Sequence, residues 1–201
     1  ASADSVAAAA PLGAAEDGQM KAFVTGGTGF VGAALVRELL DDRIEVCALA
    51  RPGADLRNLA GLPVTIADGD LRDEHSLATA MQGCAWVFHV AAYYGTAASD
   101  AALMYAVNVD GTQNVLKAAR ETGVQRIVHC STIGAIGRAS DGSLPTEDTP
   151  FNLWQTASHY ARSKYQAECA ALDAAASGLP VVVVNPCAPV GPRDIKPSSS
   201  G

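Results

Sequence analysis

The stretch KAFVTGGTGFVGAALVRELL, from Lys21 to Leu40, decides the fold of this chain. A short apolar run leads into clustered glycines, and apolar residues then recur at helical spacing, which predicts a strand, a tight turn and a helix. A pyrophosphate binds well at such a turn, because the N–H groups of a helix N-terminus attract negative charge and a Cβ would hold the ligand away. We therefore predict a nucleotide cradle at Gly26, Gly29 and Gly32, although such glycines can also serve only the close packing of a helix on a strand.

Composition sets bounds on size and partners. The chain has 201 residues, 49% of them hydrophobic, which is enough for the core of one domain. Its formal net charge of −7 argues against nucleic acid or an anionic membrane as the main partner, because no basic stripe is present to neutralise phosphates. No apolar run approaches the ~20 residues that a membrane-spanning helix needs. The composition favours a small-molecule partner.

The cysteines and the N-terminal residues indicate the cellular compartment to expect for this protein. Five cysteines are widely spaced without a Cys-x-x-Cys pair, so the sequence predicts neither a disulfide framework nor a zinc site, but reduced and mostly buried thiols in a cytoplasmic protein. Residues 1–19 are rich in alanine and lack the basic start and long apolar stretch of a signal peptide. We expect a disordered leader over 1–19 and a single domain over 20–201.

Apolar runs and helical patterns alternate along the rest of the chain. After the first strand, the runs predict buried strands over 43–50, 63–68, 85–92, 126–131 and 180–185. Helical patterns begin near Asp73 and extend over 101–121 and 156–177, and a long polar loop over 134–154 is a candidate site loop. Strict alternation of strands and helices predicts an α/β fold with a doubly wound parallel sheet.

Two residues at predicted strand ends bear on the choice of nucleotide. Arg51 follows the second strand, where an acidic residue would hold the ribose of NAD and an arginine suits the 2′-phosphate of NADP. The alternative is that Arg51 is an ordinary surface charge. Asp70 follows the third strand and is placed either to accept from the adenine amino group or to cap the next helix. The sequence favours NADP, with NAD as the alternative.

A candidate catalytic set follows the fifth strand. Tyr160 and Lys164 are four residues apart on a predicted helix, so both side chains lie on one face. The lysine charge is expected to lower the pKa of the phenol toward the working range. Thr132 ends the fifth strand and can hydrogen-bond the same substrate oxygen. Tyr-x-x-x-Lys also occurs by accident on helix surfaces, and His89, within an apolar run, is interpreted as a core histidine rather than a catalyst.

The segments TGGTGFVG, DGDLRD, HVAA, NVDGT, YARSK and NPCAPVGPRD together resemble the extended short-chain dehydrogenase/reductase family, also called the NAD-dependent epimerase/dehydratase family. The similarity covers residues 20–201 and is greatest to the hopanoid-associated sugar epimerase group and to dihydroflavonol reductases. It implies a Rossmann sheet with strand order 3-2-1-4-5-6. It also implies homodimers formed through the helices that carry Asn108 and Tyr160.

The resemblance also implies residue roles. The catalytic set is Thr132, Tyr160, Lys164 and Asn108. The residues expected to bind the cofactor are Gly26, Gly29, Phe30, Val31, Gly32, Arg51, Asp70, Leu71, Ala91, Ala92, Tyr93 and Pro186. No metal ligand is implied.

Departures from the family pattern favour one activity. Dehydratases of the family have Asp-Glu after the strand-end hydroxyl residue, where this chain has Ile133 and Gly134, and epimerases have Val-Tyr-Gly where residues 135–137 read Ala-Ile-Gly. These differences favour a reductase over an epimerase. Family members also continue into a smaller substrate domain, whereas this chain stops at Gly201. The substrate domain is therefore expected to be missing or truncated, which leaves either a fragment of a longer enzyme or a nucleotide-binding module without turnover.

Overall fold

A computed structural model describes residues 20–95 and 97–195 of the chain. It contains one six-stranded parallel sheet in the order β3-β2-β1-β4-β5-β6, so the predicted strand order is confirmed. The strands are β1 (Lys21–Thr25), β2 (Glu45–Ala50), β3 (Thr65–Asp68), β4 (Trp86–His89), β5 (Arg126–Cys130) and β6 (Val181–Val184). The leader expected over 1–19 lies outside the described residues.

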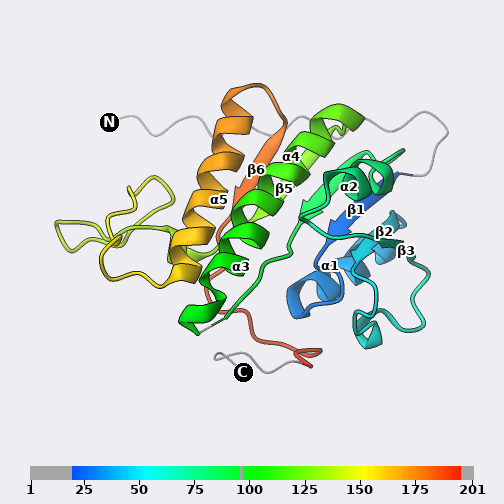
Figure 1. The fold of residues 1–201 in the computed structure, drawn as a ribbon, viewed down its shortest axis with the longest axis horizontal. Helices are drawn as coiled ribbons and strands as arrows, with labels where there is room; N and C mark the ends of the chain where they lie inside the picture. Colours follow the sequence, from blue (N-terminus) through cyan, green and yellow to red (C-terminus); the bar gives the residue numbers. More distant parts are fainter. Residues whose placement is uncertain (1–19, 96, 196–201) are drawn as a thin grey trace.

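Helices connect the strands and cover the sheet (Figure 1). The main helices are α1 (Phe30–Asp41), α2 (Glu74–Ala80), α3 (Ala101–Tyr105), α4 (Gly111–Thr122) and α5 (His159–Ala176). Short 3₁₀ turns are η1 (Arg57–Leu59), η2 (Ala98–Asp100) and η4 (Ile133–Ala135). The segment predicted as one helix over 101–121 consists of α3 and α4 joined by a π turn, η3 (Ala106–Asp110).

Alternate residues of the central strands enter two separate cores. Phe23 of β1 packs with residues of α2, α4 and α5, including Leu77, Val115 and Ala171. Its neighbours Ala22 and Val24 pack on the opposite face of the sheet with residues of α1, including Val36 and Leu39. Because successive side chains of a strand point to opposite faces, the apolar runs of the sequence become strands buried on both sides, as parallel sheets require.

Two predicted elements differ in detail. The last helix begins at His159 rather than at residue 156, because the Ser158 side chain accepts the Ala161 N–H and caps the helix there. The prediction that β6 is buried is wrong. It is an edge strand, and Val182 and Val184 are 44% and 41% exposed because the face opposite α5 is uncovered there.

The structure also answers the expectations about cysteines. All five cysteines are free, as predicted. Cys47 and Cys84 are buried, Cys130 and Cys169 are half-buried and Cys187 is exposed, so the expectation that most are buried is wrong.

Within residues 20–95 and 97–195, no helix is long and apolar enough to cross a membrane. No group of three His, Cys, Asp or Glu side chains in that part of the chain is placed to hold a metal ion.

Candidate nucleotide-binding site

A cavity of about 520 Å³ opens at the carboxyl ends of strands β1 to β4. In open α/β sheets, ligands bind at this edge, where the strand order reverses, and here β1 lies between β2 and β4. Twelve of the residues predicted from the sequence line the cavity: Gly26, Gly29, Phe30, Val31, Gly32, Arg51, Asp70, Leu71, Ala91, Ala92, Tyr93 and Tyr160. The fold thus brings the predicted cofactor residues together with the candidate catalytic tyrosine.

The glycine turn leaves no room for side chains. Gly26 has φ of +74°, and a Cβ there would lie 2.6 Å from the Ala91 backbone nitrogen. At Gly32 a Cβ would lie 2.1 Å from the Gly26 carbonyl oxygen. The turn therefore packs backbone against backbone at the N-terminus of α1, where N–H groups can face a pyrophosphate. This close packing fits a dinucleotide at the carboxyl end of β1.

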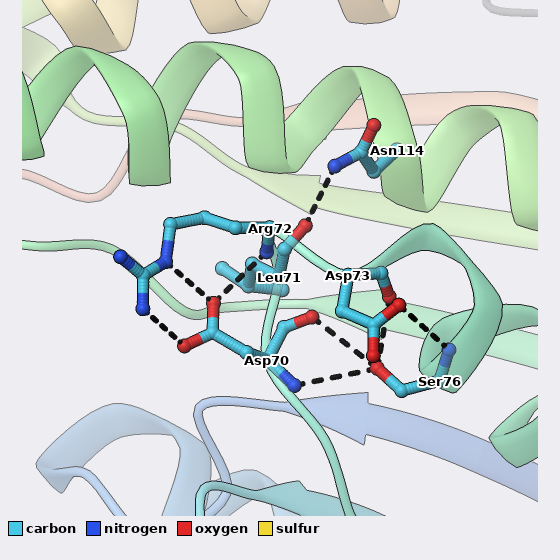
Figure 2. A network of polar contacts seen from close by, with 6 residues as sticks. All are labelled: Asp70, Leu71, Arg72, Asp73, Ser76 and Asn114. Carbon is cyan, nitrogen blue, oxygen red and sulfur yellow. Dashed lines mark hydrogen bonds and ion pairs between the residues drawn. The ribbon is translucent and has the colours of Figure 1, made fainter.

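The loop after β3 forms one wall of the cavity, and Figure 2 shows its polar contacts. The Asp70 carboxylate accepts from Arg72 Nε at 2.9 Å and from Arg72 Nη2 at 2.8 Å. Hydrogen bonding to Arg72 is the largest effect on Asp70 and lowers the pKa of its carboxyl to about 2. The alternative of Asp70 as a helix cap is wrong, because the side chain of Asp73 caps α2.

Asn114 of α4 ties the same loop to the helix layer. Its Nδ2 donates to the Leu71 carbonyl oxygen at 2.9 Å, as Figure 2 shows. Ser76 Oγ donates to the Asp73 carbonyl oxygen at 2.8 Å. These contacts hold the backbone of a cavity wall in place without a ligand. Arg51 also lines the cavity and is exposed, and its positive charge contributes to the lowered pKa of Asp70.

Tyr160 and Lys164 project from the same face of α5, but they differ in surroundings. The Tyr160 ring lies edge-on against Tyr94, with ring centroids 4.9 Å apart, and lines the cavity. Lys164 is 2% exposed, and its Nζ donates to the Cys130 carbonyl oxygen at 2.7 Å. Burial lowers the pKa of Lys164 to about 8.

The expectation that Lys164 lowers the pKa of Tyr160 is wrong in this structure. Burial raises the pKa of the phenol, and nearby Cys130 and Tyr94 add to that effect. Desolvation penalises the phenolate, while the ammonium group of Lys164 is directed to a backbone carbonyl of β5. Tyr160 is therefore a neutral phenol near neutral pH, which is the form of a proton donor.

The other predicted residues lie outside the cavity lining. Thr132 Oγ1 accepts the Gly134 N–H at 3.2 Å, and the Pro186 carbonyl accepts the Ile133 N–H at 3.0 Å. Asn108 is 2% exposed and supports the cavity from behind. Its Oδ1 accepts the Tyr93 N–H at 2.7 Å, and its Nδ2 donates to the Tyr93 carbonyl at 3.0 Å.

Sequence reasoning missed Asn58 and the contribution of Asp194 and Ile195 to the cavity wall. Asn58 is 4% exposed, and its Nδ2 donates to the Thr28 and Arg193 carbonyls at 3.1 Å each. Asp194 and Ile195 complete the cavity wall beside the glycine turn. No periodic signal marks these residues, because their role depends on contacts between segments far apart in the chain.

Comparison with known proteins identifies the family. Residues 22–201 match the model of the NAD dependent epimerase/dehydratase family. The chain belongs to this family. It is similar to the “Putative dihydroflavonol 4-reductase” of Synechocystis sp., with 45% identity over 89% of this chain and 52% of the relative. It is also similar to sterol demethylase protein B of Methylococcus capsulatus, with 39% identity over 90% of this chain and 55% of that protein.

Solved structures of similar sequence share the fold. The crystal structure of gox2253 matches with a TM-score of 0.82 and 44% identity, over 89% of this chain and 54% of that one. The UDP-glucose 4-epimerase of Thermus thermophilus, in complex with NAD, matches with a TM-score of 0.72 and 31% identity, over 83% of this chain and 54% of that one. This chain thus spans about half the length of each of these relatives.

Proposed function

We propose that this chain binds NADP(H) and forms the cofactor half of a reductase that acts on a small carbonyl compound. Arg51 carries the preference for NADP, because it directly follows β2 and lines the same cavity as the glycine turn. An arginine there suits a 2′-phosphate, whereas NAD-specific sites place a carboxylate at that strand end. Nearby Asp55 is paired with Arg57 at 2.7 Å, which offsets its negative charge.

The residues present can perform the protein's part of a carbonyl reduction. A reduced nicotinamide supplies a hydride to the carbonyl carbon when it is bound. Tyr160 donates its phenolic proton to the carbonyl oxygen, so an alcohol and the oxidised cofactor result. Thr132 Oγ1 accepts the Gly134 N–H, which leaves its own hydrogen to donate to the same substrate oxygen. Lys164, one helical turn after Tyr160, holds the end of β5 against α5 by donating from Nζ to the Cys130 carbonyl oxygen at 2.7 Å.

Replacing Arg51 tests the cofactor assignment. We expect Arg51→Ala to weaken NADPH binding about tenfold or more, because a charge-assisted contact to the 2′-phosphate is lost, and to leave NADH binding unchanged. Fluorescence titration of the purified chain with each nucleotide measures both. Arg126→Ala is the matched control, because Arg126 is exposed at the first residue of β5, at the amino ends of the strands and away from the cavity. Equal loss of NADPH and NADH binding in Arg51→Ala contradicts a role in 2′-phosphate recognition.

Replacing Tyr160 tests the chemistry. In a chain of the relatives' full length, we expect Tyr160→Phe to lower the rate of ketone reduction by at least about a hundredfold, with NADPH affinity changed less than about threefold. The assay follows NADPH oxidation over a panel of small ketones. Turnover of a nucleotide sugar without net NADPH oxidation would instead support the epimerase alternative, which the similarity to UDP-glucose 4-epimerase favours. Nucleotide binding without any turnover would support the module alternative.

A further inference from the structure

A continuous chain of buried hydrogen bonds runs beneath the cavity from β1 to the π turn. The Ala91 N–H donates to Thr25 Oγ1 at 3.2 Å, and Thr25 Oγ1 lies 2.7 Å from His89 Nδ1. On the other side of the ring, His89 Nε2 lies 2.9 Å from Thr112 Oγ1, which donates to the Asn108 carbonyl oxygen at 2.6 Å. The side chains of Thr25, His89 and Thr112 are at most 1% exposed.

The chemistry of these groups permits one direction for every bond. A carbonyl oxygen only accepts, so the single hydroxyl hydrogen of Thr112 points to Asn108. Thr112 Oγ1 must then accept from His89, which places the ring hydrogen on Nε2. In the neutral ring Nδ1 is left as an acceptor for the hydroxyl of Thr25, and Thr25 Oγ1 accepts the Ala91 N–H. Burial keeps the ring neutral by lowering the pKa of His89 to about 3.

Both ends of this chain lie at the cavity. Ala91 lines it directly, and Asn108 holds the backbone of Tyr93 through two hydrogen bonds. The segment 91–93 is thus fixed at its first residue by Thr25 and at its last by Asn108. Asn108 Nδ2 also donates to Ser163 Oγ at 3.0 Å, and Ser163 Oγ donates to the Tyr160 carbonyl at 2.8 Å. The same network therefore reaches the helix that carries Tyr160.

We propose that His89 and Thr112 are positioning residues. Through this chain of hydrogen bonds, each with one fixed direction, they hold the cofactor-lining segment 91–93 and the π turn in fixed relative positions. The inference rests on the proposed function, since it assigns the two residues to nucleotide binding. The π turn joins α3 to α4 and carries Asn108, and irregular turns of this kind are frequent at functional sites. A hydroxyl at position 112 is needed, because it must accept from His89 and donate to Asn108 at once.

Substitutions of Thr112 provide the test. Thr112→Val has nearly the same shape but breaks two bonds, and we expect it to weaken NADPH binding about tenfold. Thr112→Ser retains the hydroxyl and is expected to bind within about twofold of the wild type. Thr122→Val is the matched control, because Thr122 Oγ1 donates to the Ala118 carbonyl of the same helix at 2.8 Å. We expect the control to lose stability without losing NADPH affinity.

A second measurement reports on the hydrogen-bond chain in the absence of any nucleotide. Nitrogen NMR of the wild-type imidazoles is expected to show His89 as a neutral ring with hydrogen on Nε2 and a bare Nδ1, and Thr112→Val is expected to mix in the other tautomer. Hydrogen on Nδ1 of the wild-type ring, or equal NADPH affinity in Thr112→Val and Thr122→Val, would overturn the proposal. Failure of the wild type to bind either nucleotide would sink the proposed function, and with it the positioning role, while the ring tautomer would still report on the hydrogen-bond chain.

Discussion

Lowering the pH from 6.5 to 4.5 is expected to remove about 5 kcal/mol from the free energy of unfolding. His89 and His129 are 1% and 0% exposed, and burial is the largest cause that lowers their pKa values, to about 3 and about 2. Between these values and the ordinary 6.5, the unfolded chain binds more protons than the folded one. Stability is therefore full above pH 6.5 and falls as the pH decreases.

Urea unfolding followed by circular dichroism at several pH values between 7 and 4.5 measures this loss. We expect the slope to correspond to about two protons in the wild type and to about one in His129→Leu. His129 suits this substitution because neither of its ring nitrogens has a hydrogen-bond partner within the described residues. His75→Gln is the control, since His75 is exposed on α2. An unchanged slope in His129→Leu would show that the acid sensitivity arises elsewhere.

Gly26→Ala is expected to destabilise the fold and to abolish tight nucleotide binding. A Cβ at this position would lie 2.6 Å from the Ala91 nitrogen and 2.8 Å from its Cα, so the backbone of a cavity wall must move. Overpacking of this kind costs roughly 1–3 kcal/mol, in addition to about 1–2 kcal/mol for a side chain in the left-handed region. NADPH affinity is expected to fall at least about tenfold, because the pyrophosphate cradle and Ala91 shift together.

Gly61→Ala separates the two costs. Gly61 has nearly the same φ as Gly26, +76° against +74°, but nothing lies within 4 Å of its Cβ position. We expect this variant to lose only about 1–2 kcal/mol and to bind NADPH as the wild type does. Chemical denaturation and NADPH titration of the two variants side by side measure the difference. Equal losses in both would mean that contact with Ala91 does not constrain the glycine turn.

Residues with a local signal could be placed from the sequence. The glycines between an apolar run and a helical pattern, and the apolar alternation of the later segments, predict the sheet and the glycine turn because each depends on neighbours in the chain. The resemblance to the family adds other lining residues, among them Leu71 and Ala91. Arg51 and Asp70 could be located because strand ends are marked by the turn residues that follow them. Their partners could not be predicted. Asp70 binds Arg72, and nothing local distinguishes this pairing from a free carboxylate.

The sequence by itself determined the parallel sheet, its order through the family pattern, and the gathering of the glycine turn, Arg51 and Tyr160 at one edge. Only the tertiary structure decided the electrostatics of the site. Whether Lys164 acts on Tyr160 or on a backbone carbonyl depends on the path of β5 beneath α5, and burial, which raises the pKa of the phenol, is a property of the packed layers. The direction of the hydrogen bonds through His89 likewise depends on Thr25 and Thr112, which are 64 and 23 residues away in the sequence. Such pairings arise only when distant segments pack, because burial removes water from a polar group and makes a hydrogen-bond partner from another segment favourable.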